Sequence, residues 1–315
     1  MPQASSRSSC RSCEPRRARL RDTGAVSEDD DFPLPGSGSA TVAVPAPGAG
    51  PGYWAGAPCS VLDDDGTFAI AYRVRNGHDG HDETVVARSE DGERLTTVVT
   101  LDERDFGAMA VERPALVRLD DGRWRLYVCC ATPESKHWWI GAVEAGDLAD
   151  LTAADVRTVF AGGPEMGVKD PIVRRAGDAW EAWICVHPLD EPGAEDRMRT
   201  AYATSRDGLE WDWHGVVLTG RPGMWDARGA RVTAVLPDGR AAYDGRATAE
   251  ENWFERTGLA RVTGDGRIEH AGTEPVADVR YLDVVSLSDG GRRIYYEARL
   301  PDESHELRTE LIEPS

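Results

Sequence analysis

The sequence predicts an all-β fold, a five-bladed β-propeller, and two observations carry this prediction. A pattern of an apolar strand, a Gly/Asp turn and a second strand rich in aromatic residues occurs five times. The copies are spaced by 56, 57, 60 and 52 residues when they are anchored on Pro58, Pro114, Pro171, Arg231 and Asp283. A repeat of about 50 residues with strand content is typical of propeller blades.

Each repeat supplies the strands of one blade. The five two-strand units, in chain order, span residues 57–72, 113–128, 170–184, 229–243 and 281–296. A further strand follows each unit, at residues 83–89, 138–143, 198–205, 258–262 and 307–311. Three to four strands joined by tight Gly/Asp turns make a blade, and radial packing of five blades leaves only short edges. A two-sheet β-sandwich is the alternative architecture.

The chain divides into a leader, residues 1–52, and the propeller, residues 53–315. The leader is first Ser- and Arg-rich and then Pro/Gly/Ala-rich, without hydrophobic alternation, so we expect it to be disordered. No stretch resembles the apolar core of a secretory signal or a span of about 18 apolar residues. We therefore expect a cytoplasmic protein.

The charge balance argues against two classes of partner. The net charge is −19, which repels phosphate backbones and anionic membranes, so we expect neither a nucleic-acid nor a membrane partner. Only two lysines, Lys136 and Lys169, stand among 36 basic residues. The lone pair Cys10 and Cys13 has neither a partner pair for zinc nor a redox context, and we expect no metal and no cofactor.

Candidate functional residues lie where the innermost strand of each blade begins, because these positions converge near the propeller axis. The candidate catalytic carboxylates are Glu112, Asp170, Asp226 and Asp283. The candidate binding residues are Trp54, Arg113, Lys169, His187, Trp225, Arg228, Arg231 and Tyr281. Acids, guanidinium groups and aromatic rings at one place suit a sugar, whose hydroxyls take hydrogen bonds and whose ring faces stack on tryptophan. The segments 252–256 and 296–299 are candidate rim elements.

Structural roles are the alternative for each of these residues. Glu112 and Arg113, or Asp226 and Arg228, could form ion pairs that only close the channel. Asp170 could cap a turn before Pro171. The tryptophans could pack between blades, and His187 could be a satisfied structural histidine. A loop cluster could bind a cation through His78, Asp79, His81 and Asp82.

One stretch carries a family resemblance. The run Lys169-Asp170-Pro171-Ile172-Val173, followed by residues 177–183, resembles the third-blade signature of the five-bladed glycoside hydrolases. These are glycoside hydrolase families 32, 43, 62 and 68, with family 130, which contains phosphorylases, as a relative. The run from Ser205 to Trp211 is also similar to a motif of that group. The likeness spans blades one to five.

The resemblance implies a mechanism with three acids. Family 43 enzymes place a general-base Asp on blade one, a pKa-tuning Asp on blade three and a general-acid Glu on blade four. Asp170 matches the blade-three position. The blade-one position holds Ala57, and Arg228-Gly229-Ala230 stands where the blade-four Glu is expected. Two of the three family 43 acids are therefore replaced in this sequence.

Three functions remain open from the sequence. The first is a glycoside hydrolase or phosphorylase that acts on a small carbohydrate in the central pocket, where Asp170 works with Glu112, Asp226 or Asp283. In the phosphorylase form, phosphate is the nucleophile, and Arg113, Arg228 and Arg231 could hold it. The second is a catalytically inactive propeller that binds carbohydrate. The third is a scaffold for protein interaction.

Overall fold

A computed structural model describes residues 32–77 and 80–314 of the chain. These residues form twenty β-strands and three single-turn 3₁₀ helices, η1 (Glu103–Phe106), η2 (Leu148–Asp150) and η3 (Ala153–Asp155). The described part holds no α-helix, and hence no helix long and apolar enough to cross a membrane. The predicted all-β class is confirmed.

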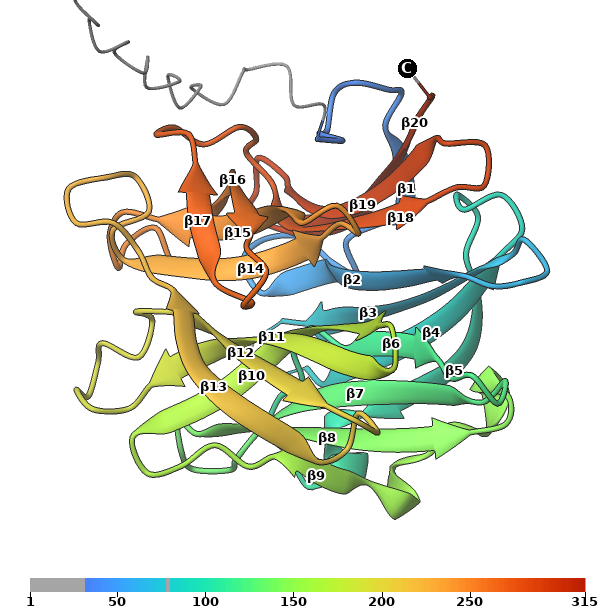
Figure 1. Cartoon of the computed structure of the whole chain (residues 1–315), viewed down its shortest axis with the longest axis horizontal. Helices are drawn as coiled ribbons and strands as arrows, with labels where there is room; N and C mark the ends of the chain where they lie inside the picture. The colour runs from blue at the N-terminus through green and yellow to red at the C-terminus, as the bar shows by residue number, and fades with distance from the viewer. Residues whose placement is uncertain (1–31, 78–79, 315) are drawn as a thin grey trace, which may run out of the picture. The chain divides into compact units, whose positions relative to one another are not determined.

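Most strands form antiparallel sheets in chain order (Figure 1). One four-stranded sheet holds β6 (Ala115–Arg118), β7 (Trp124–Ala131), β8 (Trp138–Ala145) and β9 (Arg157–Phe160). The next holds β10 (Met166–Ala176), β11 (Ala179–Pro188), β12 (Arg199–Ser205) and β13 (Trp211–Leu218). A third holds β14 (Gly229–Val235), β15 (Arg240–Arg246), β16 (Arg256–Val262) and β17 (Ile268–Ala271).

The remaining strands form one eight-stranded sheet made of two parts. One part holds β2 (Tyr53–Leu62), β3 (Phe68–Asn76), β4 (Asp82–Ser89) and β5 (Thr96–Asp102). The other holds β18 (Arg280–Ser286), β19 (Arg292–Arg299), β20 (His305–Ile312) and β1 (Thr41–Val44), which pairs with β20. Between the two parts, β2 and β20 share a single residue pair, Trp54 with His305.

The segment before β2 corrects the predicted domain boundary. Phe32 is buried in a hydrophobic cluster with residues of β14, β15, β18 and β19. The carboxylate of Glu310 on β20 accepts hydrogen bonds from the backbone N–H groups of Gly36 and Gly38. Residues 32–52, which the composition assigned to the leader, therefore pack on the sheets, because β20 offers a free edge that β1 covers. The leader residues 1–31 lie outside the described part.

In the described part of the chain, the core consists of five hydrophobic clusters, each between successive sets of strands. Side chains of β3 and β4 meet β6 and β7, those of β7 and β8 meet β10 and β11, and those of β11 and β12 meet β14 and β15. The fourth cluster joins β14 and β15 to β18 and β19, and the fifth joins β18 and β19 back to β3 and β4. On β11, Ile184 belongs to one cluster and its neighbour Trp183 to the next, as expected for a strand buried on both faces.

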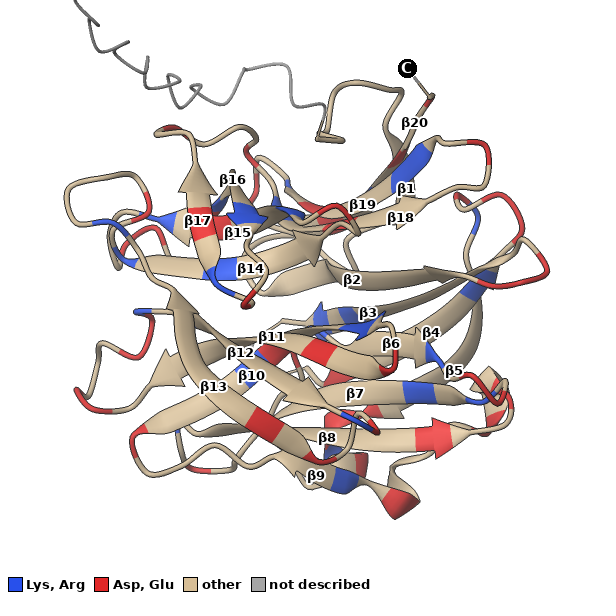
Figure 2. Ribbon diagram, in the orientation of Figure 1, with Lys and Arg blue, Asp and Glu red and all other residues tan. Residues whose placement is uncertain are grey.

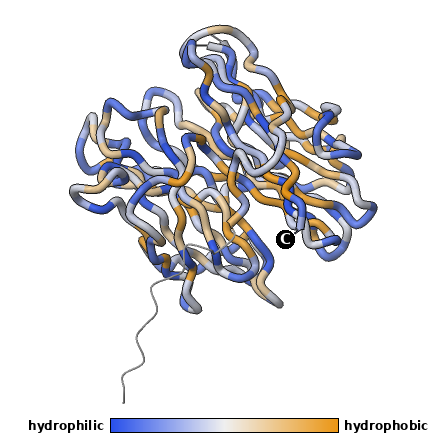
Figure 3. Tube along the Cα trace, turned by 90° about the horizontal axis from the view of Figure 1, so that it is seen from above, coloured by the Kyte–Doolittle hydropathy of each residue, from blue (hydrophilic) through white to orange (hydrophobic). Residues whose placement is uncertain are grey.

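The distribution of hydropathy and charge along the chain agrees with this arrangement. Hydrophobic segments concentrate within the strands and hydrophilic ones at the turns (Figure 3). Charged residues of both signs occupy the turns but also several strands (Figure 2). The charged residues on strands include those of the site described below.

We call the first strand of each set, which is β2, β6, β10, β14 or β18, its inner strand. A β-bulge recurs near the start of three of them. The register shifts between Gly56 and Cys59 on β2, between Lys169 and Ile172 on β10, and between Arg280 and Asp283 on β18. Ala57, Asp170 and Tyr281 stand at corresponding bulge positions with φ of 53°, 49° and 52°. Such left-handed backbone at non-glycine residues is costly and often marks a functional site. The bulge makes Tyr281, rather than Asp283, the counterpart of Asp170.

Candidate functional site

A cavity of about 350 Å³ lies where the inner strands begin. Its lining includes five of the residues predicted from the sequence: Glu112, Lys169, His187, Arg231 and Tyr281. The predicted rim segment 252–256 contributes Asn252, Trp253 and Glu255. The structure therefore brings these residues together from sheets that are distant in the sequence.

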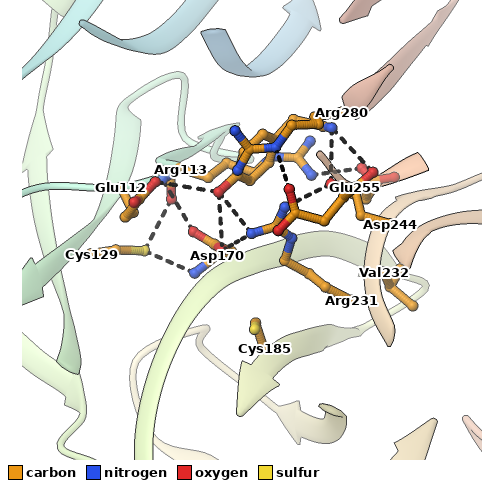
Figure 4. A network of polar contacts seen from close by, with 12 residues as sticks. Glu112, Arg113, Cys129, Asp170, Cys185, Arg231, Val232, Asp244, Glu255 and Arg280 are labelled. Atoms are coloured by element: carbon orange, nitrogen blue, oxygen red, sulfur yellow. Dashed lines mark hydrogen bonds and ion pairs between the residues drawn. The ribbon is translucent and has the colours of Figure 1, made fainter. Parts of the chain in front are cut away.

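Arginines that line this cavity pair with buried carboxylates (Figure 4). Arg231 donates to Asp170 at 2.9 Å and to Asp244 at 2.7 Å. Arg280 contacts Glu255 at 2.7 Å and Glu297 at 2.9 Å. Because a buried charge is costly without a partner, these pairs fix the side chains in place.

Glu112 is the acid of the predicted set that faces the cavity. Its side chain is 10% exposed, and it accepts from Arg73 at 2.7 Å and from Arg75 at 3.5 Å. Burial opposes ionisation of this carboxyl, but the positive charges of Arg73, Lys169 and Arg75 outweigh burial and hold its pKa well below the usual range. Glu112 is therefore a carboxylate at neutral pH.

Asp170 lies directly behind Glu112 and is fully buried. It accepts a hydrogen bond from the backbone N–H of Arg113 at 3.2 Å as well as the bond from Arg231. The Tyr281 hydroxyl lies 3.3 Å from Glu112 Oε2 and 3.5 Å from Asp170 Oδ2, and it accepts from Arg231 at 2.7 Å. One phenolic proton thus faces two carboxyl groups.

The other wall of the cavity carries Lys169 and His187. The Lys169 ammonium lies 4.8 Å from the ring centroid of Trp138, a cation–π contact. Burial, with the nearby charges of Lys169 and Arg246, lowers the pKa of His187 to about 3. His187 is therefore a neutral imidazole at physiological pH.

Glu255 resembles Glu112 in its electrostatics. Burial opposes its ionisation, whereas Arg280 and Arg246 together lower its pKa to about 2. Glu112 and Glu255, two of the acids that line the cavity, are consequently held in the charged form.

The side chains of two predicted residues line a different cavity. Asp283 lines a second cavity, of about 290 Å³, together with Arg113 and Ser60. The Arg113 side chain crosses between sheets, donating to the carbonyls of Pro58 at 2.9 Å and Thr233 at 2.7 Å, and contacting Asp283 at 3.2 Å. The expectation that Asp283 and Arg113 join the same pocket is corrected. The register of β18 shifts between Arg280 and Asp283, and it is Tyr281, not Asp283, that lines the first cavity.

Asp226, Trp225 and Arg228 do not line the cavity either. Asp226 is fully buried and accepts from the Tyr243 hydroxyl at 2.8 Å and from Arg221 at 2.9 Å. Trp225 stacks on Tyr243 with ring centroids 5.6 Å apart. Arg228 forms a two-pronged pair with Asp196 at 2.7 and 2.9 Å. These contacts correct the expected convergence, and they also differ from the alternative ion pair, because Asp226 pairs with Arg221 and Arg228 with Asp196.

Trp54 also packs instead of lining the cavity. It is 3% exposed and stacks on His305 with centroids 5.1 Å apart. Its ring lies 5.4 Å from that of Trp253, a residue that does line the cavity. Trp54 therefore supports the site from behind.

The predicted cation loop is only partly described. His78 and Asp79 lie outside the described residues, and Asp82 is paired with Arg75 at 2.7 Å. His81, Asp102 and Glu103 place ligand atoms within 4.8 Å of one another. Glu103 contacts His81, and Arg104 contacts Asp102, so both carboxylates already have partners within the protein.

Sequence reasoning missed Arg75 and Trp138, which also line the cavity. Arg75 ends β3 opposite Trp54 at the start of β2, and Trp138 begins β8. In a meander, the second strand ends beside the start of the first, and the third begins there. By that rule, the end of the second strand and the start of the third could have been predicted as site positions, together with the start of the first.

The fold is similar to that of solved glycoside-processing enzymes. One similar structure is described as belonging to the GH130 family of mannoside phosphorylases, which contains glycoside hydrolases that target β-1,2 mannosidic linkages in Candida mannan. It superposes on this chain with a TM-score of 0.62 at 15% sequence identity. The match covers 86% of this chain and 87% of that one. β-1,2-Mannobiose phosphorylase from Listeria innocua superposes with a TM-score of 0.58 at 13% sequence identity, and the match covers 89% of this chain and 92% of that one. α-L-Arabinanase from Penicillium chrysogenum superposes with a TM-score of 0.59 at 12% sequence identity, and the match covers 87% of this chain and 98% of that one.

This chain shares their fold. The resemblance predicted from the sequence is thereby confirmed at the level of fold, while the activity has to be argued from the site. Neither a protein-family model nor a curated protein matches the sequence.

Proposed function

We propose that the sheets form five blades around a central axis. The eight-stranded sheet then counts as two blades, because only the pair Trp54 and His305 joins its halves. β1 supplies the fourth strand of the last blade, so the N-terminal and C-terminal segments close the ring together. The five clusters, the last of which leads back to the first sheet, support this count.

We further infer that the protein binds a small carbohydrate in the 350 Å³ cavity and cleaves an O-glycosyl bond there, by hydrolysis or phosphorolysis. One observation carries this proposal: a carboxyl–hydroxyl–carboxyl chain runs from Glu112 and Tyr281, which line the cavity, to the buried Asp170. Trp138 and Trp253 also line this cavity. Glycoside cleavage requires carboxyl groups beside the scissile bond, and the cavity has a volume typical of small-ligand sites.

In this proposal, Glu112 supplies the negatively charged carboxylate of the site. A carboxylate at that place stabilises the positive charge that develops on the sugar ring, or orients the attacking water or phosphate. Asp170 and Arg231 hold the Tyr281 hydroxyl beside Glu112, so they act as positioning residues. Arg75 and Lys169 would hold phosphate if phosphate is the acceptor.

A second candidate is a catalytically inactive carbohydrate-binding propeller. It is favoured because two of the acids that line the cavity, Glu112 and Glu255, are kept ionised by nearby positive charges. A general acid needs a pKa near the working pH. Under this alternative the cavity binds sugar and leaves the bond intact.

An activity screen separates the two candidates. The protein is assayed on aryl glycosides and oligosaccharides, with and without phosphate, beside Glu112→Gln and the control Asp283→Asn. Turnover that is lost in Glu112→Gln and kept in Asp283→Asn supports the enzyme. Sugar binding without turnover supports the inactive propeller, and turnover indifferent to Glu112 contradicts the assigned site.

A further inference from the structure

Both lysines of the chain line the same cavity. Lys136 and Lys169 are the only lysines among 36 basic residues, and both belong to its lining. Lysine presents a compact point charge, whereas arginine presents a planar fork suited to carboxylate pairs. The placement of lysines here calls for a physical reason.

The arginines of this cavity are matched by the protein's own acids. Arg75 pairs with Asp82, Arg231 with Asp170 and Asp244, and Arg246 and Arg280 with Glu255. Among the residues that the structure describes, no carboxylate lies within 4.0 Å of either lysine ammonium. Lys169 is nevertheless only 8% exposed. The charge of Lys169 acts on Glu112, but that carboxylate already pairs with Arg73 and Arg75. A nearly buried ammonium that shares its counter-charge with two arginines is costly.

A polar group beside Lys169 is also left without a partner. Lys169 pairs with Cys185, and Gly167 pairs with His187 two residues along the same strand pair, so Lys169 and His187 share one face of the sheet. The His187 Nδ1 atom is buried and has no hydrogen-bond partner. Lys169 and His187 therefore line the cavity from the same face of this strand pair.

We propose that the carbohydrate bound in this cavity is itself anionic, carrying a carboxylate or a phosphate monoester that contacts Lys169. The inference rests on the proposed carbohydrate function and names its substrate class. His187 supplies a hydrogen bond to the same group, and Trp138 presents an apolar face beside it. Long-range attraction contributes little, since the protein carries a net charge of −19, so the preference comes from the cavity.

Calorimetric titration of the full chain tests this proposal. The probes are glucuronate, galacturonate and glucose 6-phosphate, their neutral counterparts glucose and galactose, and inorganic phosphate. An anionic sugar should bind roughly ten- to a hundredfold more tightly than its neutral counterpart, as expected for hydrogen bonds to a charged group. Lys169→Gln should abolish that difference, and Lys169→Arg should keep part of it.

Matched controls keep the test independent of folding. Arg267→Gln removes one positive charge from an exposed turn, where Arg267 pairs with Asp265, and should leave the preference intact. If Lys169→Gln does not fold, as judged by circular dichroism, the exposed Lys136→Gln should still reduce the preference.

The outcomes are distinguishable. Equal affinity for charged and neutral sugars overturns this inference and leaves the proposed function standing. Tighter binding of a neutral sugar together with inorganic phosphate also overturns it, because the anion would then be a separate reactant. Failure of every sugar to bind overturns the proposed function itself.

Discussion

Glu310 is predicted to anchor the N-terminal segment that completes the last set of strands. Its carboxylate is 1% exposed and accepts from Gly36 N at 2.9 Å, from Gly38 N at 3.0 Å and from the Tyr296 hydroxyl at 2.6 Å. The perturbation is Glu310→Ala, made in the full chain and in a chain that begins after Val44.

The size of the effect follows from these contacts. Hydrogen bonds to a charged group contribute about 1.5–3 kcal/mol each, but a released segment regains bonds to water, so the two glycine bonds do not add in full. We expect a coupling of about 2 kcal/mol between Glu310→Ala and the truncation. At roughly 2–4 °C per kcal/mol, this corresponds to about 4–8 °C in melting temperature.

A double-mutant cycle by urea denaturation measures this coupling. Glu313→Ala, an exposed residue near the same chain end, serves as the control and should change stability little. Equal destabilisation by Glu310→Ala with and without residues 1–44 would refute the anchoring role.

Three further predictions concern the two cavities. Arg231→Met leaves Asp170 and Asp244 as buried charges without their partner and should cost about 3–5 kcal/mol in urea denaturation; a loss below about 1 kcal/mol contradicts the pairing. The pKa of His187 is lowered from 6.5 to about 3, so below pH 6.5 the unfolded chain binds a proton that the folded one refuses, and stability falls toward pH 3. His187→Gln should flatten the curve of unfolding free energy against pH in that window, and an unchanged curve would rule His187 out as its source. Asp283→Asn should leave sugar affinity unchanged in calorimetry, whereas weakened binding would place Asp283 at the sugar site.

Much of the fold could be predicted because its signals are local. Alternating apolar residues and Gly/Asp turns act through nearest neighbours, and Ala182, Trp183 and Ile184 lie on a strand as predicted. The start of that blade also identified Lys169 and Asp170 as site residues. The composition of residues 32–52, in contrast, gave no strand signal, because β1 is stabilised by the edge of β20 more than 260 residues away.

Part of the candidate site could also be predicted from local sequence signals. Glu112 and Arg231 were identified from their places before or within inner strands. Arg75 and Trp138 were missed because they belong to the second and third strands of their sheets. Which end of an inner strand a side chain faces depends on its bulge, and the bulge depends on pairing with the neighbouring strand.

The sequence by itself determined the repeat, the strands and turns, and the clustering of polar residues where the inner strands begin, since these follow from local backbone preference and hydrophobic periodicity. Only the tertiary structure decided which charges neutralise one another. It placed Asp283 and Arg113 at one cavity and Glu112 and Tyr281 at another. It also gave an ion pair to each arginine that lines the cavity, whereas Lys169 shares the charge of Glu112 with Arg73 and Arg75. Such pairing depends on distances of a few ångströms between residues far apart in the chain, because Coulomb energy and desolvation are set by three-dimensional contact rather than by spacing in sequence.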